Sequence, residues 1–135
     1  MHRDHSGYRT LIHKATTDKI LKAFFQVHTA LGYGFLEVVY QRAIHLTLTR
    51  MGVECRREVP MDVYYLAECV GEYRADLVVE GKVIVETKAS PGITSKHDLQ
   101  IYNYLKASKL EVGLVLNLGP TATFHRYVCS DNRKS

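Results

Sequence analysis

The sequence lacks long apolar runs. None approaches the roughly 18 residues that a membrane-spanning helix needs, which argues against a membrane protein. Residues 1–5 have no apolar core of the kind that a secretion signal carries, so we expect a cytoplasmic protein. The three cysteines, Cys55, Cys69 and Cys129, are odd in number, and no CxxC pair is present. We therefore expect reduced cysteines with structural roles.

Repeats, low-complexity segments and linkers are also missing, so the 135 residues are expected to form one domain around one hydrophobic core. We place this domain at residues 17–129, after an arm of residues 1–16 and before a polar tail of residues 130–135. The net charge of +4 suits a polyanionic partner such as nucleic acid. It does not demand one, because the basic residues are dispersed.

Two stretches in the first half of the chain have the apolar spacing of helices. The first is expected to begin at Asp18, a plausible N-cap, and to end near Gly32. The second covers residues 35–51, and Glu37 lies in its apolar stripe. A buried, ionised carboxylate without a partner costs several kcal/mol, so Glu37 should be paired, protonated or close to a metal. The alternative is a glutamate at the edge of the stripe whose carboxylate reaches water.

A third helical stretch follows at residues 96–108. Thr94 or Ser95 would cap it, and Ser95 with Asp98 has the form of a capping box. Spacings of three and four place three polar or aromatic residues on one face of this helix: His97, Gln100 and Tyr104.

Apolar and alternating stretches predict five strands. They cover residues 54–65, 72–79, 83–88, 112–118 and 123–128. Pro60 suggests that the first strand lies at an edge or contains a bulge, and residues 66–69 read as a short connection. The order ααβββαββ predicts an α/β (α+β) fold in which helices flank a mixed central sheet.

Polar residues end the apolar strand at residues 83–88. Because strand side chains alternate between faces, Glu86 and Lys88 should point the same way. A two-residue turn after the preceding strand would leave Asp76 and Glu86 on opposite faces. A three-residue turn at residues 80–82, or a bulge, would place Asp76 opposite Glu86 and Arg74 opposite Lys88.

These residues suit phosphodiester hydrolysis assisted by a divalent cation. Mg²⁺ (or Mn²⁺) takes oxygen ligands, usually one or two carboxylates with water and phosphate, and Asp76, Glu86 and the backbone carbonyl of Thr87 could supply them. Lys88 could orient the attacking water, take its proton or stabilise the charge that develops on the phosphate. Glu37 could extend the anionic site toward a second cation. Four basic residues are weaker candidates for phosphate contacts: Arg56, Arg57, Arg74 and Lys96.

The order of Glu37, Asp76, Glu86-Thr87-Lys88 and Gln100 resembles the PD-(D/E)XK nuclease superfamily, and Gln100 with Tyr104 resembles the QxxxY element of its RecB-like branch. Residues 34–40 form a literal GxxExxY, as in the small bacterial GxxExxY proteins. The resemblance covers about residues 18–128. Two positions depart from the superfamily pattern, because Ala75 replaces the proline before the aspartate and Thr87 replaces an aliphatic residue.

The resemblance implies a restriction-endonuclease-like core in which Asp76 and Glu86 bind the metal. Lys88 would be the catalytic base or charge stabiliser, and Glu37 would be an accessory acid. Gln100 and Tyr104 would position water, metal or substrate.

Two classes of function remain open at this point. The first is a Mg²⁺-dependent nuclease that acts on DNA, for which Tyr64 and Tyr65, Tyr73 or the last strand could supply a homodimer interface. The second is a catalytically silent module that binds nucleic acid or protein and retains the nuclease fold, with Glu86 and Lys88 as a structural ion pair. The sequence contains no RNA-binding signature that would favour RNA.

Overall fold

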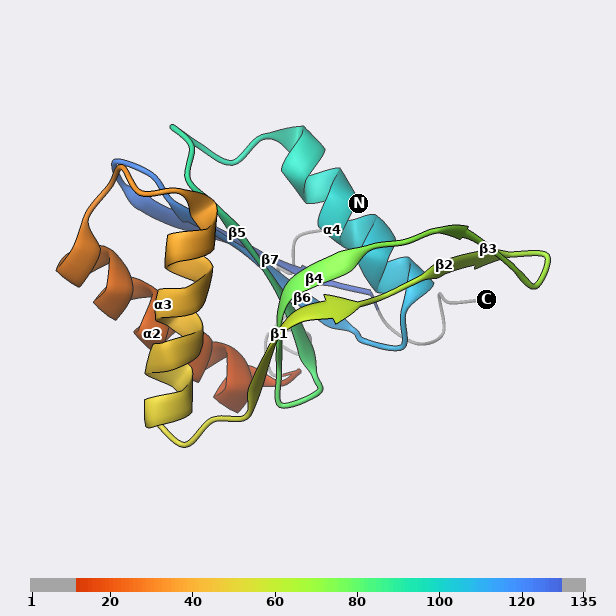
Figure 1. The fold of residues 1–135 in the computed structure, drawn as a ribbon, viewed down its shortest axis with the longest axis horizontal. Coiled ribbons are helices and arrows are strands. Elements are labelled where there is room, and N and C mark those ends of the chain that lie inside the picture. The colour runs from red at the N-terminus through yellow and green to blue at the C-terminus, as the bar shows by residue number, and fades with distance from the viewer. Residues whose placement is uncertain (1–11, 130–135) are drawn as a thin grey trace.

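The computed structural model describes residues 12–129 (Figure 1), so most of the predicted arm and the whole predicted tail lie outside the described residues. Within that range no helix has the length and apolar character needed to cross a membrane.

A mixed sheet of five strands forms the centre of the fold, as the sequence predicted. Its strands are β1 (Cys55–Pro60), β4 (Arg74–Val79), β5 (Val83–Lys88), β6 (Val112–Leu118) and β7 (Ala122–Val128), and they lie in the order β1-β4-β5-β6-β7. The pair β5–β6 is parallel and the other three pairs are antiparallel. The strands β5 and β6 are buried along nearly their whole length, which agrees with their almost continuous apolar sequences.

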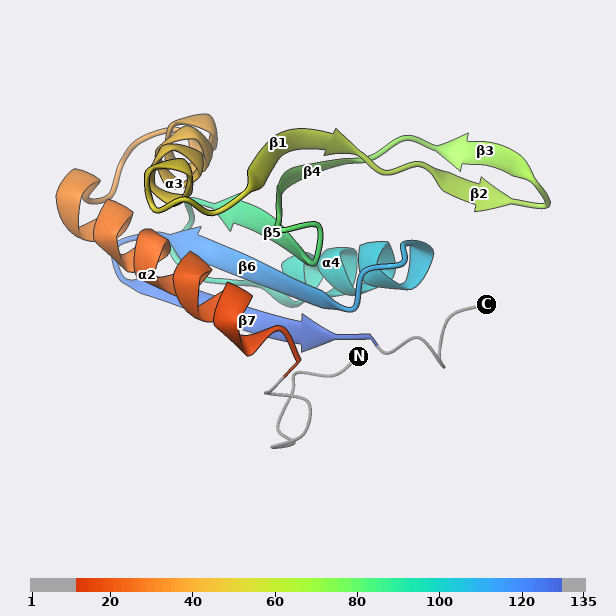
Figure 2. The same ribbon diagram turned by 90° about the horizontal axis from the view of Figure 1, so that it is seen from below.

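The helices cover both faces of this sheet. Figures 1 and 2 show α2 (Lys14–Leu31) and α3 (Glu37–Arg50) on one face and α4 (Ser95–Ala107) on the other. Ile101 and Leu105 of α4 approach β6 closely at Gly113, where an added Cβ would lie 2.9 Å from Ile101 Cδ1. Glycine at this position therefore allows the helix to lie directly on the strand.

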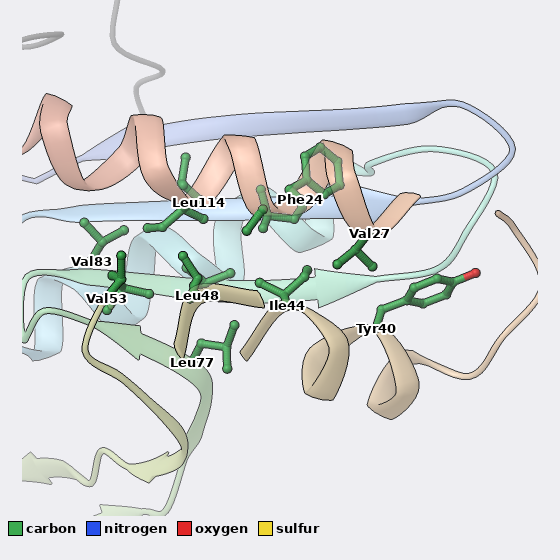
Figure 3. Close-up of a cluster of buried hydrophobic side chains, with 14 of the residues drawn as sticks. Phe24, Val27, Tyr40, Ile44, Leu48, Val53, Leu77, Val83 and Leu114 are labelled. Atoms are coloured by element: carbon green, nitrogen blue, oxygen red, sulfur yellow. The ribbon is translucent and has the colours of Figure 1, made fainter. Parts of the chain in front are cut away.

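The larger core cluster lies between α2, α3 and the sheet (Figure 3). Each fully buried aliphatic or aromatic side chain contributes about 1.5–3 kcal/mol relative to an exposed one. Members of this cluster that no solvent reaches include Phe24, Ile44, Leu48, Leu77, Val83 and Leu114.

The first helix begins about one turn earlier than predicted. It starts at Lys14, after His13, and Asp18 forms an i,i+4 ion pair with Lys14 instead of capping the helix. Thr16 and Thr17 are buried, and the Thr16 hydroxyl donates to Oε1 of Glu80 (2.5 Å). The contact with Glu80, 64 positions along the chain, thus extends the helix at its N-terminus. Local periodicity cannot reveal such a contact.

A second small sheet appears where the sequence suggested a broken strand and a connection. β2 (Val63–Tyr65) and β3 (Glu68–Gly71) form a hairpin that projects from the body of the protein (Figure 2). Its two turn residues, Leu66 and Ala67, have φ values of 50° and 64°. The sequence does not predict this turn, because two-residue turns in which both residues have a left-handed backbone usually contain Asn-Gly or Asp-Gly.

Candidate active site

The turn between β4 and β5 has three residues, as the argument from side-chain alternation required. Leu77 pairs with Val85 and Val79 pairs with Val83, so residues 80–82 form the turn. The φ values of Glu80 and Gly81 are 54° and 64°. Continued by one step, this register places Asp76 opposite Glu86.

Side chains connect the two strands beyond Leu77 and Val85, where the regular ladder ends. The Asp76 backbone N–H donates to Oε2 of Glu86 (3.2 Å). Oδ2 of Asp76 accepts from the Thr87 backbone N–H (2.8 Å) and from the Thr87 hydroxyl (3.0 Å). Each carboxylate is therefore hydrogen-bonded to the strand that carries the other acid. The bond from the threonine hydroxyl to Asp76 explains the polar residue at position 87, and the sequence pattern did not indicate this contact.

Glu86 is only 6% exposed, and burial raises its pKa from 4.5 to about 7. The hydrogen bond from the Asp76 backbone and the positive charge of Lys88 act in the opposite direction, while the charges of Glu58 and Glu37 raise the pKa further. Ionisation of Glu86 therefore costs free energy, because the carboxylate is removed from water and is repelled by other acids. A bound cation would relieve both.

Lys88 is half-buried, and its positive charge lowers the pKa of both Glu86 and His97. Within residues 12–129, however, no ion pair joins its amine to Glu86 or to another acid. The structural ion pair considered above is not formed. The amine is therefore available to a water molecule or a phosphate.

Glu37 is the first residue of α3, and it is exposed. Glu37 is therefore not buried in the apolar stripe of the helix. It lies at the edge of that stripe, where its carboxylate reaches water. The loop before it is built by the neighbouring motif residues: Gly34 has φ 122°, and the buried Tyr40 hydroxyl donates to the Gly32 carbonyl (2.5 Å) and accepts from the Phe35 N–H (3.2 Å). Glu37 influences the pKa of Glu86 and His97, so its charge acts on the same region.

Within the described part of the chain, Gln100 and Tyr104 on the polar face of α4 contact each other and Tyr73, and not these acids. Gln100 donates to the Tyr104 hydroxyl (3.4 Å), and the Tyr104 ring stacks on Tyr73. Among the described residues neither of these side chains forms a hydrogen bond with Asp76, Glu86 or Lys88.

The start of α4 differs from the predicted capping box. Thr94 is the N-cap, and His97 completes the box by accepting the Thr94 N–H at Nδ1 (3.3 Å). Asp98 instead pairs with Nδ1 of His125 on β7 (2.9 Å) and accepts from the Tyr127 hydroxyl. This long-range contact removes Asp98 from the cap. Burial and the charge of Lys88 lower the pKa of His97, which favours the neutral ring that the cap requires.

The basic candidates do not form one cluster of contacts. Arg57 donates from Nε to Oε1 of Gln41 (3.0 Å), and Gln41 is 4% exposed, so this arginine is held in place by a buried partner that the sequence did not indicate. Arg56, Arg74 and Lys96 are exposed. For the predicted dimer surface, Tyr64 and Tyr65 are 65% and 66% exposed, whereas Tyr73 is occupied by its stack on Tyr104.

The three cysteines are unpaired, as predicted. Cys129 is buried, Cys55 is half-buried and Cys69 is exposed. Burial, with the nearby charge of Glu54, raises the pKa of Cys55 to about 11, so this thiol is protonated and unreactive near neutral pH.

The oxygen atoms of Asp76, Glu86 and Thr87 on β4 and β5 suit magnesium better than a metal that is bound by protein ligands alone. In residues 12–129 no group of three or more His, Cys, Asp and Glu side chains could hold a metal ion. Two adjacent carboxylates and a backbone carbonyl are hard oxygen donors, and Mg²⁺ commonly keeps several waters beside only one or two carboxylates. The residues present therefore fit such a cation.

The mixed sheet with helices on both faces and with Asp76, Glu86 and Lys88 at one end of its central strands defines an α/β protein of the restriction-endonuclease-like type. Residues 14–127 match the PD-(D/E)XK nuclease superfamily, and the chain belongs to that superfamily. No curated protein and no solved structure matches the chain.

Proposed function

We propose that this protein is a Mg²⁺-dependent nuclease that hydrolyses phosphodiester bonds in DNA, and that it belongs to the GxxExxY branch of its superfamily. The observation that supports the proposal is that Asp76 and Glu86 each hydrogen-bond to the strand that carries the other acid, while Lys88, two residues after Glu86, has no ion-pair partner among the described residues. Superfamily membership supports it independently.

In this proposal Asp76, Glu86 and the Thr87 carbonyl hold the cation. When bound, the cation would neutralise developing charge on the phosphate and lower the pKa of the attacking water. The Thr87 N–H and hydroxyl keep Asp76 oriented through two hydrogen bonds. These two donors restrict the rotation of the carboxylate before any substrate arrives, which reduces the cost of organising the site.

Lys88 has the role of orienting the water, accepting its proton or stabilising the charge on the phosphate. Glu37 is the accessory acid, because its exposed carboxylate acts electrostatically on Glu86. Gln100 and Tyr104 would contact substrate or water from α4. The exposed basic residues Arg56, Arg74 and Lys96 are candidates for phosphate contacts, which need no base specificity.

The test is incubation of the pure full-length protein with linear, circular, branched and single-stranded DNA in Mg²⁺, Mn²⁺ or EDTA. Cleavage should require the cation and should be lost in Lys88→Ala. Lys82→Ala is the matched control. Lys82 is an exposed lysine in the turn at residues 80–82, so this variant should cleave like wild type. Circular dichroism would verify that both variants fold.

Two results would count against the proposal. Equal cleavage by wild type and Lys88→Ala would assign the activity to another site or to a contaminant. A wild-type protein that cleaves none of these DNAs, yet binds them, would support the catalytically silent binding module instead.

A further inference from the structure

Glu58 lies in the middle of β1, directly beside the candidate site. On either side of it, Arg57 pairs with Leu77 and Val59 pairs with Ala75. The same register places Glu58 opposite Asp76, but this one pair is missing from an otherwise continuous ladder. The strand pair is therefore interrupted at the step that carries Asp76.

The backbone of Glu58 explains the interruption. Its φ of 53° lies in the left-handed region, which a glutamate inside a strand rarely adopts. On one side of this step Leu77 packs into the core under α2 and α3, and on the other side Val59 and Ala75 belong to the core under α4. The strand pair thus rotates at Glu58. Unfavourable backbone conformations of this kind are kept where the surrounding structure imposes them, often at functional sites.

The carboxylate of Glu58 is exposed. No side chain in residues 12–129 forms an ion pair or hydrogen bond with it. By the register of the strands, Glu58 lies opposite Asp76, which in turn lies opposite Glu86. An unpaired acid close to two other carboxylates is electrostatically unfavourable unless positive charge or bound water occupies the space between them.

We infer that Glu58 is a positioning residue of the proposed cation site, and that its carboxylate accepts hydrogen bonds from water bound at Asp76 and Glu86. This inference rests on the proposed function. With fewer than three acidic or imidazole side chains converging, the cation would retain several waters, and these waters need acceptors. Acceptors of this outer kind often change metal affinity strongly without touching the metal.

The test is calorimetric titration of the full-length protein with Mn²⁺, in a buffer of about pH 8 in which the carboxylates are ionised. Glu58→Gln should bind Mn²⁺ more weakly, by on the order of ten-fold. Glu58→Asp keeps the charge and suits a left-handed backbone better, so it should retain most of the affinity. Glu54→Gln is the control, because Glu54 is an exposed acid just before the same strand and its removal should have little effect.

Glu58→Gly separates the proposed role from a purely structural one. Glycine adopts positive φ without strain, so this variant should unfold at a higher temperature than wild type while binding Mn²⁺ as weakly as Glu58→Gln. If Glu58 served only the fold, Glu58→Gln would leave the Mn²⁺ affinity unchanged, and that result would overturn the inference. An equal loss in Glu54→Gln would also overturn it, since the effect would then be one of overall charge.

A double variant, Asp76→Asn with Glu86→Gln, distinguishes this inference from the proposed function. If the heat of Mn²⁺ binding disappears in the double variant while Glu58→Gln binds Mn²⁺ with wild-type affinity, only the role of Glu58 is wrong. If the heat survives the double variant, or if wild type shows none, both the proposed cation site and the inference fail.

Discussion

The buried carboxylate of Glu86 leads to a prediction about how stability depends on pH. Its pKa is raised from 4.5 to about 7, chiefly by burial, so the folded protein binds this proton more tightly than the unfolded chain does. The contribution of Glu86 to the free energy of unfolding should therefore fall as pH rises between about 4.5 and about 7. A pKa shift of one unit corresponds to about 1.4 kcal/mol. Above pH 7 the raised pKa of Glu86 therefore lowers the free energy of unfolding by about 3 kcal/mol.

Replacing Glu86 with glutamine should remove that loss. The amide oxygen can still accept the hydrogen bond from the Asp76 N–H, and the amide carries no charge to be desolvated or repelled by Glu58 and Glu37. Glu86→Gln should thus be more stable than wild type by about 3 kcal/mol near pH 8 and nearly equal to it near pH 4. For 135 residues this corresponds to a rise of about 10 °C in the unfolding midpoint.

Urea unfolding in EDTA at about pH 4, 6 and 8 would measure this effect without bound cations. Glu54→Gln serves as the control, because an exposed carboxylate should change little across the same range. The reasoning is refuted if Glu86→Gln is no more stable than wild type near pH 8, or if its advantage over wild type does not grow between about pH 5 and about pH 8.

Three further predictions concern other parts of the fold. Asn117→Ala should destabilise the protein by about 3 kcal/mol in urea unfolding, because the fully buried Asn117 amide bonds both the N–H (3.0 Å) and the carbonyl (2.9 Å) of Ser90; a loss below about 1 kcal/mol would contradict this account. A thiol reagent near neutral pH should modify the exposed Cys69 quickly and Cys55 slowly, as mass spectrometry of the labelled peptides would show; equal rates would contradict the raised pKa of Cys55. Replacing Leu66-Ala67 with Asn-Gly should stabilise the β2–β3 hairpin by about 1 kcal/mol and slow amide exchange there, whereas faster exchange would count against the left-handed turn.

Several features of the site were predictable from the sequence because they depend on local geometry. Side chains alternate with a period of two along a strand, so only an odd-numbered turn or a bulge could put Asp76 opposite Glu86, and the turn at residues 80–82 has three residues. The GxxExxY segment was recognisable as a unit for a similar reason. Gly34 supplies the positive φ, and Tyr40 closes the loop by hydrogen bonds with Phe35 inside the segment and with Gly32 just before it.

Other features depend on residues that are far apart in the chain. The contact of Asp98 with His125 decides which residues cap α4, and the contact of Thr16 with Glu80 decides where α2 begins. The left-handed backbone of Glu58 follows from the rotation of β1 against β4 between two separate cores. Periodicity determines which face a residue occupies along its own helix or strand. Packing between distant segments determines which polar groups meet and where a strand must twist, and so it placed Glu58 at the position opposite Asp76 in the register of β1 and β4.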